Sequence, residues 1–339
     1  MSGINPFRSS EVLISVIVPC MNEEQVIVQT NDRLVSVLGA IDGIDYEVIY
    51  VDDGSSDETP GLLDKLQAAN PNIGYIRLSR NFGHQLAITA GIEHARGDAA
   101  IVIDADLQDP PEVIPEMIEK WRMGYHVVYG TRTERVGESK FKTGTAKAFY
   151  RLLNRLSDVK IPLDTGDFRL MDRKVIDAFL SMPETHRFVR GMVAWAGFNQ
   201  IALPYRRDAR AAGTTKYPIR KMLRFALDGV ASFSLAPLRF MTLMGFTTSA
   251  LAMMGILYAL LARLLTDNWV PGWAATFIAF LFLGGIQLMS MGIIGEYIGR
   301  IYAEVKSRPL YLIQERKGFE GMPQHDGKLR NSRSDVQGL

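Results

Sequence analysis

Two long stretches without a charged residue place the strongest constraint on how this chain can fold. None of the 23 residues in 240–262 is charged, and neither is any of the 28 residues in 268–295. A helix needs about 20 apolar residues to cross a bilayer, so both stretches are long enough. Buried helices of a soluble core are the alternative, but such helices seldom run this long without charge. The sequence therefore predicts a hairpin of two transmembrane helices, 240–265 and 269–295.

The charges beside these stretches predict their orientation. Basic residues precede the first stretch and follow the second, whereas the connection "RLLTDN" contains only Arg263 as a basic residue. Because basic residues favour the cytoplasmic side, we expect the part of the chain before the hairpin and both termini in the cytoplasm. Trp269 and Trp273 lie near the outer end, where aromatic side chains favour the membrane interface. The expected location is the plasma (inner) membrane, with two spans.

The part of the chain before this hairpin, 1–215, has the pattern of an α/β domain. Apolar strands alternate with helices from residue 11 onward, and near-continuous Val/Ile strands of this kind are typical of a mostly parallel sheet covered on both faces. Strands are predicted at 13–19, 46–54, 73–79, 99–106 and 126–132, and helices at 23–38, 59–69, 84–95 and 111–123. Ligands of such sheets bind at the carboxyl ends of the strands.

Three segments complete the predicted organisation. Residues 216–239 contain "KYPIRKMLRFALDGV" and read as a basic amphipathic juxtamembrane segment. Residues 296–315 are expected to form a second interfacial helix or segment, and 316–339 a polar, disordered tail. Gly295 and Gly299 allow close packing of helices, which is compatible with a homo-oligomer.

Polar residues gather where the predicted strands end. The first strand is followed by Pro19, Asn22 and Glu23, the second by Asp52 and Asp53, and the fourth by Asp104 and Asp106. Each residue alone can be explained as a helix cap or a turn, as Asp109 before two prolines is. Their convergence on one edge of one sheet favours a ligand site.

Asp104 and Asp106 give the strongest indication of what kind of ligand this site binds. Side chains alternate faces along a strand, so these two carboxylates are expected to point the same way. Two like charges so close together are costly unless a positive charge lies between them. A divalent cation with hard oxygen ligands would supply that charge, whereas a capping loop is the simpler alternative.

Other ligand classes are excluded or weakened by the sequence. No two glycines are separated by a single residue and no Gly-Lys-Ser/Thr occurs, so dinucleotide and Walker phosphate loops are absent. The 38 Lys and Arg residues nearly equal the 37 Asp and Glu residues in number, so the net charge does not indicate binding to nucleic acid. The single cysteine excludes internal disulfides and fits a reducing compartment. A phosphate would be held by metal and by two basic clusters, "GTRTERVGESKFK" and "RRDARAAGTTKY", unless these face solvent or lipid headgroups.

Several motifs resemble those of one enzyme family. "SVIVPCMNEE", "VDDGSSDET", "NFGHQLAITAGIEHARGD" and "DADLQDPPE" resemble the successive motifs of family-2 glycosyltransferases with the GT-A (Rossmann-like) fold. The later "YGTRTER", "TGDFRLMD", "RFVRG", "AGTTKY" and "GEYIGRIY" resemble the polyprenyl-phosphate branch, which includes dolichyl-phosphate mannose synthase and bactoprenol glucosyltransferases. The resemblance covers about residues 11–313.

The resemblance implies roles for individual residues. The nucleotide-sugar donor would be held by Pro19, Asn22, Glu23, Asp52 or Asp53, and Asp104. A Mg²⁺ or Mn²⁺ ion would be bound by Asp106, with Asp104 and Gln108 assisting. The phosphates of donor or acceptor would contact Arg132, Arg135, Arg210, Thr215 and Lys216. Thr215 replaces a common Ser, and His84-Gln85 stands where relatives often carry a basic–acidic pair.

The implied reaction moves a hexose from a nucleotide sugar, UDP- or GDP-linked, to a polyprenyl phosphate with inversion. The metal would neutralise the leaving diphosphate. The acceptor phosphate is mostly ionised near neutral pH, so Asp167 is expected to orient groups rather than remove a proton. A processive polysaccharide synthase and a non-catalytic nucleotide-sugar-binding membrane adaptor are the alternatives. No Gln-x-x-Arg-Trp motif supports the first, and the intact Asp104, Asp106 and Gln108 argue against the second.

Overall fold

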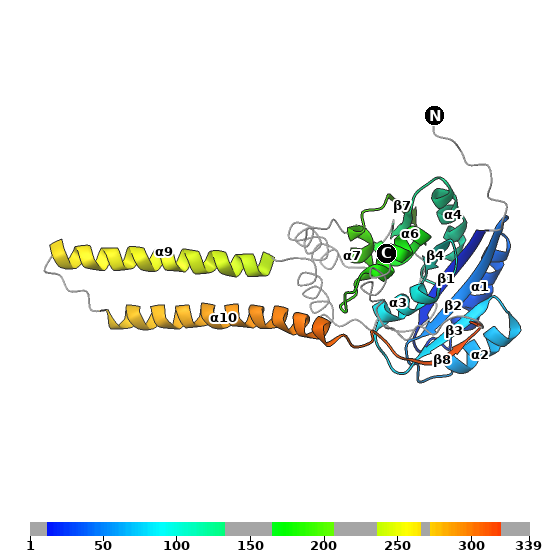
Figure 1. The fold of residues 1–339 in the computed structure, drawn as a ribbon, viewed down its shortest axis with the longest axis horizontal. Helices are drawn as coiled ribbons and strands as arrows, with labels where there is room; N and C mark the ends of the chain where they lie inside the picture. Colours follow the sequence, from blue (N-terminus) through cyan, green and yellow to red (C-terminus); the bar gives the residue numbers. More distant parts are fainter. Residues whose placement is uncertain (1–11, 133–164, 207–235, 266–271, 320–339) are drawn as a thin grey trace, which may run out of the picture. The chain divides into compact units, whose positions relative to one another are not determined.

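The computed structural model describes residues 12–132, 165–206, 236–265 and 272–319. These residues fall into two units (Figure 1). One unit, the sheet domain, comprises 12–132, 165–206 and 308–319. The other, the helical hairpin, comprises 236–265 and 272–307.

The sheet domain alternates strands and helices for most of its length (Figure 1). Its first half contains β1 (Val12–Cys20), α1 (Ile27–Gly39), β2 (Ile44–Asp52), α2 (Thr59–Ala69), β3 (Ile73–Leu78), α3 (His84–His94) and β4 (Ala99–Val102). Its second half contains η1 (Pro111–Val113), α4 (Ile114–Arg122), β5 (Val127–Arg132), β6 (Thr165–Asp172), α6 (Arg173–Ser181), α7 (Val189–Trp195), β7 (Gln200–Tyr205) and β8 (Ile313–Lys317). The helix expected at 59–69 has those bounds in the structure.

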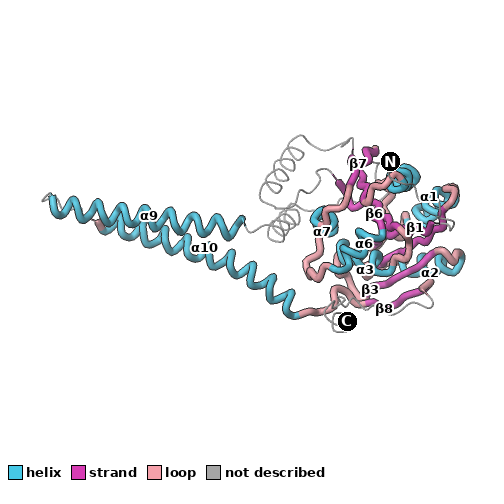
Figure 2. The backbone as a smooth tube through the Cα atoms, turned by 45° about the horizontal axis from the view of Figure 1, so that its top comes forward, coloured by secondary structure: helices cyan, strands magenta, loops and turns pink. Residues whose placement is uncertain are grey.

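The eight strands form a single sheet in the order β7-β5-β6-β4-β1-β2-β3-β8 (Figure 2). Neighbours β4, β1, β2 and β3 are parallel, as is the pair β5 and β7. Strand β6 runs antiparallel to both of its neighbours, and β8 runs antiparallel to β3. The expected mostly parallel α/β sheet is confirmed, and the two reversed strands are additional to it.

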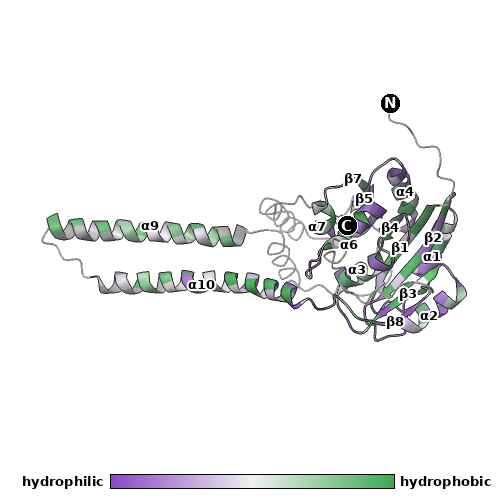
Figure 3. Ribbon diagram, in the orientation of Figure 1, coloured by the Kyte–Doolittle hydropathy of each residue, from purple (hydrophilic) through white to green (hydrophobic). Residues whose placement is uncertain are grey.

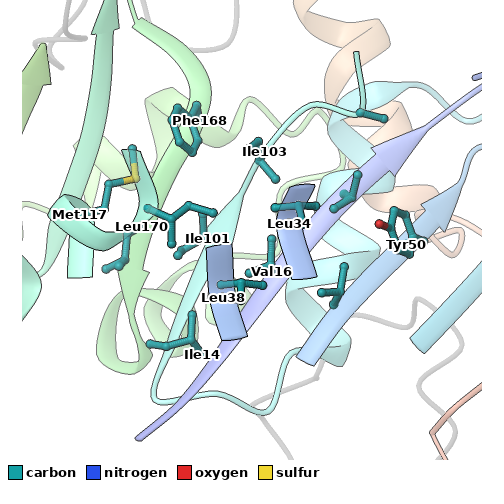
Figure 4. Close-up of a cluster of buried hydrophobic side chains, with 14 of the residues drawn as sticks. Ile14, Val16, Leu34, Leu38, Tyr50, Ile101, Ile103, Met117, Phe168 and Leu170 are labelled. Carbon is teal, nitrogen blue, oxygen red and sulfur yellow. The ribbon is translucent and has the colours of Figure 1, made fainter. Parts of the chain in front are cut away.

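Apolar side chains of the strands form the core. Ile14 and Val16 of β1 pack with Leu34 and Leu38 of α1 on one face, and each of these side chains is at most 1% exposed (Figure 4). On the other face α3 comes so near β1 that a Cβ at Gly91 would lie 2.2 Å from a methyl of Ile17. Burial of apolar area of this kind is the main term that stabilises the fold.

Strand β4 is shorter than its sequence pattern suggested. We expected a strand over 99–106, but β4 ends at Val102, and Ile103 adds only one further hydrogen bond to β1. The chain then turns, because the Thr30 hydroxyl of α1 donates to the Ala105 carbonyl at 2.8 Å and Leu107 has a positive φ of 60°. The alternation of apolar and acidic residues after Val102 is that expected of a strand, but contacts with α1 hold this segment in a turn.

The end of the sheet domain also differs from the expectation. We expected 296–315 to form an interfacial helix or segment and a polar tail to begin at residue 316. Instead, residues 313–317 form β8, which pairs with β3 at the edge of the sheet. The polar sequence "IQERK" carried no apolar strand signal because an edge strand faces solvent.

The segment around β8 is anchored by two aromatic residues. Tyr311 is fully buried and its hydroxyl donates to the Glu93 carboxylate of α3. Phe319 covers Gly74 so closely that a Cβ at Gly74 would lie 2.5 Å from the Phe319 ring. Leu310, Tyr311 and Phe319, which follow the hairpin, are therefore buried in the sheet domain.

The helical hairpin consists of α9 (Ala236–Leu265) and α10 (Trp273–Lys306), which lie side by side in Figures 1 and 2. The Ser290 hydroxyl lies 3.5 Å from the Met241 sulfur across the two helices. By length and composition Ile278–Lys306 is long and apolar enough to cross a membrane, whereas the apolar helix Phe240–Gly255 is shorter. Within α10, Arg300 forms an ion pair with Glu296, one helical turn away, at 3.0 Å.

The surface of the hairpin is apolar, as the green bands of Figure 3 show. Phe246 of α9 is 73% exposed, and Phe280 and Leu288 of α10 are 74% and 72% exposed. A soluble monomer rarely exposes contiguous apolar area on this scale. The region called juxtamembrane in the sequence, 216–239, lies outside the described residues except for its last four positions.

Candidate functional site

The candidate site lies where the parallel strands β1 and β2 end, at their carboxyl ends, and not beside an outer strand of the sheet. The parallel strands β1 and β2 end opposite one another, with Cys20 paired to Asp52. Strand β5 ends at this edge, and the antiparallel β6 begins there, with Thr131 paired to Thr165. The reversal of β6 therefore brings Asp167, its third residue, toward the edge that the parallel strands define.

Asn22 joins the loops that follow β1 and β2. Its backbone lies in the left-handed region with φ of 55°, and its N–H donates to the Ser55 hydroxyl at 2.9 Å. Its side-chain oxygen accepts from the Ser56 N–H at 2.9 Å, and the N–H of Glu23 donates to the Thr59 hydroxyl. Asn22, through its backbone and side chain, and Glu23, through its backbone, thus fix the loops beside the predicted donor site.

Asp52 and Asp53 differ in what they contact. Asp52 is fully buried; it accepts from the Ser55 N–H at 2.9 Å and lies 3.5 Å from the Arg77 guanidinium. Asp53 accepts from the N–H groups of Phe82 and Gly83 at 2.7 and 2.9 Å. Burial raises the pKa of both carboxyls, although the hydrogen bonds oppose this. Asp53 therefore fixes the loop that leads into α3.

A close backbone contact supports that loop. Gly54 has φ of 74°, and a Cβ there would lie 2.5 Å from the backbone carbon of Arg80. Only glycine combines this conformation with so near an approach. The loops after β2 and β3 consequently pack directly on each other beside the predicted donor site.

Asp104, Asp106 and Gln108 lie on the same side of the turn after β4. The three side chains are partly exposed, whereas Ala105 and Leu107 between them are buried. The shared orientation expected for the two carboxylates thus agrees with the burial pattern, although the segment is a turn rather than a strand. The Asp106 carboxylate accepts from the Gln108 N–H at 3.1 Å, which tightens the turn.

The Asp104 carboxyl has an unusual environment. Its Oδ1 is buried and accepts no hydrogen bond from the residues that the structure describes, and the nearest cationic group is His84 Nε2 at 3.5 Å. Burial, opposed by His84 and reinforced by Asp109, Asp167 and Asp106, raises the pKa of Asp104 to about 6. An incompletely satisfied carboxylate among other acids is suited to a cation.

The residues present fit a hard divalent cation that is shared with a ligand. Within the described ranges no three His, Cys, Asp or Glu side chains come together as a complete metal site. Asp104 and Asp106 supply two carboxylates, and Gln108 an amide oxygen. Mg²⁺ is commonly held by one or two carboxylates together with substrate phosphates and water, so an incomplete protein set is the expected form of such a site.

Asp167 is the centre of a charged cluster. Its Oδ1 accepts from Arg190 Nε at 2.8 Å, and its Oδ2 accepts from Arg190 and Gln85 at 3.2 Å each. His84 Nε2 lies 3.3 Å from the same Oδ2. Asp167 is only 5% exposed, and burial alone would raise its pKa, but Arg190 and His84 outweigh this and hold the pKa well below the usual range.

His84 connects this cluster to the acidic turn. Its imidazole lies within 3.5 Å of both Asp104 and Asp167 at the N-terminus of α3. Burial would lower the pKa of His84, but the hydrogen bond to Asp167 and the charge of Asp104 raise it to about 9. His84 is therefore a cation at neutral pH.

Arg132 lies at the end of β5 among supporting groups. Burial would lower its pKa, but a hydrogen bond to Tyr205 and the charge of Asp109 raise it. The Tyr205 hydroxyl in turn donates to the fully buried Asp109. A Cβ at Gly166 would lie 2.9 Å from the Arg132 guanidinium, so glycine leaves room for this cation beside Asp167.

Some predicted residues cannot be placed, and some contacts were not predicted. Arg135, Arg210, Thr215 and Lys216 lie outside the described residues. Arg190 belongs to the motif "RFVRG", but no role for it or for Gln85 could be predicted from the sequence. Gln85 and Arg190 meet Asp167 across 82 and 23 positions of sequence, and no local spacing signals such contacts.

Comparison with protein families gives two matches along the chain. Residues 15–180 match the family described as glycosyl transferase family 2. Residues 236–301 match the family described as GtrB C-terminal hairpin. The two matched segments correspond to most of the sheet domain and to the helical hairpin.

Individual relatives match nearly the whole chain. A glycosyltransferase of Bacillus subtilis (strain 168), YkcC, is 49% identical over 312 residues, covering 92% of this chain and 96% of the relative. The bactoprenol glucosyl transferase of Shigella phage SfX is 39% identical over 304 residues, covering 90% of this chain and 99% of the relative. Among solved structures, mannosyl-3-phosphoglycerate synthase from Rubrobacter xylanophilus aligns with 20% identity and a TM-score of 0.47, covering 69% of this chain and 75% of that one.

Proposed function

The chain belongs to glycosyl transferase family 2, and we propose that it transfers a hexose from a nucleotide sugar to a polyprenyl phosphate with inversion at the sugar. The observation that carries the proposal is the match to bactoprenol glucosyl transferases at 39–40% identity, over 99% of their length. That match includes both the site and the hairpin. Bactoprenol is a polyprenyl alcohol, so those names point to a lipid acceptor.

The donor would bind over the loops that follow β1, β2 and β4. Pro19, Asn22, Glu23, Asp52 and Asp53 are the residues proposed to form the nucleotide pocket. Asp53 accepts two backbone hydrogen bonds, and Asp52 is fully buried with its Oδ2 3.5 Å from the Arg77 guanidinium. Both carboxylates are therefore proposed to support the pocket by fixing its loops.

The diphosphate would lie against Asp104, Asp106 and Gln108 with Mg²⁺ or Mn²⁺. When bound, such an ion stabilises the negative charge that develops on the leaving diphosphate. The chain contributes two oriented carboxylates on a turn that Thr30 and Leu107 hold in shape. Arg132, together with Arg135, Arg210, Thr215 and Lys216, is proposed to contact the donor or acceptor phosphates.

Asp167 is proposed to orient the acceptor side rather than to act as a base. Its carboxylate accepts from Arg190 and Gln85 and lies beside a cationic His84, which makes proton uptake unfavourable. A phosphate acceptor with a pKa near 6 needs no strong base at neutral pH. Single displacement by the ionised phosphate oxygen would release the nucleoside diphosphate.

The helical hairpin is proposed to span the plasma (inner) membrane twice and keep the sheet domain on the cytoplasmic side. The exposed apolar side chains of α9 and α10 and the length of Ile278–Lys306 support this proposal. A polyprenyl acceptor carries its phosphate at the membrane surface, so such an anchor would keep enzyme and acceptor together. Association into a homo-oligomer through Gly295 and Gly299 stays a prediction.

The test is a transfer assay with purified protein in vesicles that contain undecaprenyl phosphate, using a panel that includes UDP-glucose and GDP-mannose with Mg²⁺. We expect one donor to give a single lipid-phosphate-linked sugar and an equal amount of nucleoside diphosphate. Repeated addition of sugar would identify a processive synthase instead. Tight donor binding without any transfer would identify a non-catalytic adaptor and overturn the proposal.

A further inference from the structure

Gln85 has an uncommon pair of contacts at the start of α3. Its side-chain Nε2 donates to Asp167 Oδ2 at 3.2 Å, and its side-chain Oε1 accepts from the Val189 N–H at 2.9 Å. The two contacts lie 82 and 104 positions away in sequence. One amide group therefore connects β6 to the first residue of α7.

These contacts fix both members of an ion pair. Asp167 pairs with Arg190, and Arg190 directly follows Val189 in α7. Gln85 thus holds the carboxylate through one end of its amide and the backbone next to the arginine through the other. A second bond, from Arg190 to the Thr165 carbonyl at 2.7 Å, keeps the guanidinium against the start of β6.

The position of Gln85 also links the two halves of the site. The loop before α3 is fixed by Asp53, which accepts from the N–H groups of Phe82 and Gly83. Residues 84 and 85 follow that loop, and they contact Asp167 from the N-terminus of α3. The segment 82–85 is therefore hydrogen-bonded to Asp53 at its start and to Asp167 at its end, which connects the proposed donor pocket to Asp167.

We propose that Gln85 is a positioning residue, whose amide holds the Asp167–Arg190 pair in the orientation that the acceptor phosphate needs during transfer. The inference rests on the proposed function, because it assigns Asp167 and Arg190 to the acceptor side of that reaction. Gln85 itself touches neither the proposed metal ligands nor the residues assigned to the nucleotide, as far as the described contacts go. Its loss should therefore alter turnover and acceptor use, while donor binding is retained.

A simpler role is that Gln85 only attaches α7 to the domain. The chain offers a matched control for this, because Gln200 of β7 also bonds to α7, donating from Nε2 to the Val193 carbonyl at 3.2 Å. Gln200→Leu removes an amide contact to the same helix without affecting Asp167. A second variant, Gln85→Glu, keeps an acceptor for the Val189 N–H but places a carboxylate against Asp167.

The experiment measures kcat, both KM values and the melting temperature for Gln85→Leu, Gln85→Glu and Gln200→Leu in the vesicle assay. We expect Gln85→Leu to lower kcat roughly ten- to hundredfold, since a hydrogen bond to a charged group is lost. Gln85→Glu should lose at least as much, and donor KM should stay within about twofold in both. Gln200→Leu should keep wild-type kcat.

Three results would overturn the inference. Wild-type kcat in Gln85→Glu would show that only the bond to α7 matters. An equal loss in Gln200→Leu would show a general effect of loosening α7, and a loss confined to donor KM would place Gln85 in the donor pocket. Absence of transfer by the wild-type chain is a different outcome, which would overturn the proposed function and this inference together.

Discussion

The sheet domain and the helical hairpin use the same apolar residue types in opposite ways. In the sheet domain Leu34 and Ile101 are fully buried, whereas in the hairpin Leu288 and Phe280 are 72% and 74% exposed. A domain in water is stabilised by withdrawing such side chains from solvent, and the hairpin exposes them on its outer surface. The difference indicates that the two units are built for different surroundings, and the described residues of the candidate site all come from the sheet domain.

The largest effect is expected from a substitution in the sheet domain that removes one proposed metal ligand and leaves the hairpin unchanged. Asp106→Asn should lower kcat by about a hundred- to a thousandfold, because a carboxylate that supports charge on the leaving diphosphate is lost. Melting temperature and recovery in the membrane fraction should match the wild type. Asp98→Asn, at the opposite end of the sheet, is the control. Near-wild-type kcat at saturating donor and Mg²⁺ would contradict the assignment of Asp106.

Replacing one leucine by alanine in each unit tests whether the two units bury their apolar side chains differently. Leu34→Ala should lower the free energy of unfolding of the sheet domain by about 2–5 kcal/mol, since it leaves a cavity in a packed core. Leu288→Ala should change the thermal stability of the detergent-solubilised protein by less than about 0.5 kcal/mol. Thermal unfolding of both variants in one detergent measures this. Similar losses would mean that Leu288 is packed against protein.

Replacing the hairpin tests what it contributes to turnover. A flexible Gly/Ser linker in place of 236–306 keeps the residues that form β8, and we expect a water-soluble protein that still binds the nucleotide sugar. Transfer to undecaprenyl phosphate in vesicles should fall roughly ten- to hundredfold, because the acceptor is no longer held nearby.

A short, water-soluble prenyl phosphate distinguishes two explanations of that loss. If the hairpin only anchors the enzyme, this acceptor should restore part of the rate of the linker variant. If the hairpin forms the acceptor pocket, the short acceptor should fail as well. Equal rates in vesicles for the linker variant and the full chain would contradict the anchoring role.

The Asp167 carboxyl is expected to make the stability of the sheet domain depend on pH. Its pKa in the folded protein lies below the unfolded value of about 3.9, so its ionised form contributes stability that is present above that pH. Asp167→Asn should therefore cost about 1–3 kcal/mol at pH 7. As pH falls through the folded pKa the wild type loses this contribution, so the difference should shrink below about pH 4. Urea unfolding of the linker variant across pH measures it, and a constant difference would contradict the ion-pair account.

Much of the sheet domain could be predicted because its signals are local. Runs such as "LISVIVP" must be buried, and the helix at 59–69 begins and ends where expected. The reversed strands could not be predicted in this way. The direction of β6 depends on which strands it pairs with, and the residues of "TGDFRLMD" themselves do not specify those strands.

The candidate site could likewise be predicted only where its residues lie close together in the sequence. Asp104 and Asp106 lie two positions apart, so their relation is visible in the sequence. The partners of Asp167 are brought to it by α3 and α7 from distant parts of the chain. Likewise, Asp53 looked like a ligand residue, while its bonds to the loop before α3 appear only in three dimensions.

The position of β8 has a consequence for how the protein is made. During synthesis β7 leaves the ribosome well before β8, and the residues between them include both hairpin helices. At 5–20 residues per second that interval lasts roughly 5–20 s. Until β8 has been made, the side of β3 opposite β2 lacks the strand that pairs with it in the structure, and an unpaired strand edge is a template for misplaced pairing. The sheet is thus completed only after both helices of the hairpin have been translated.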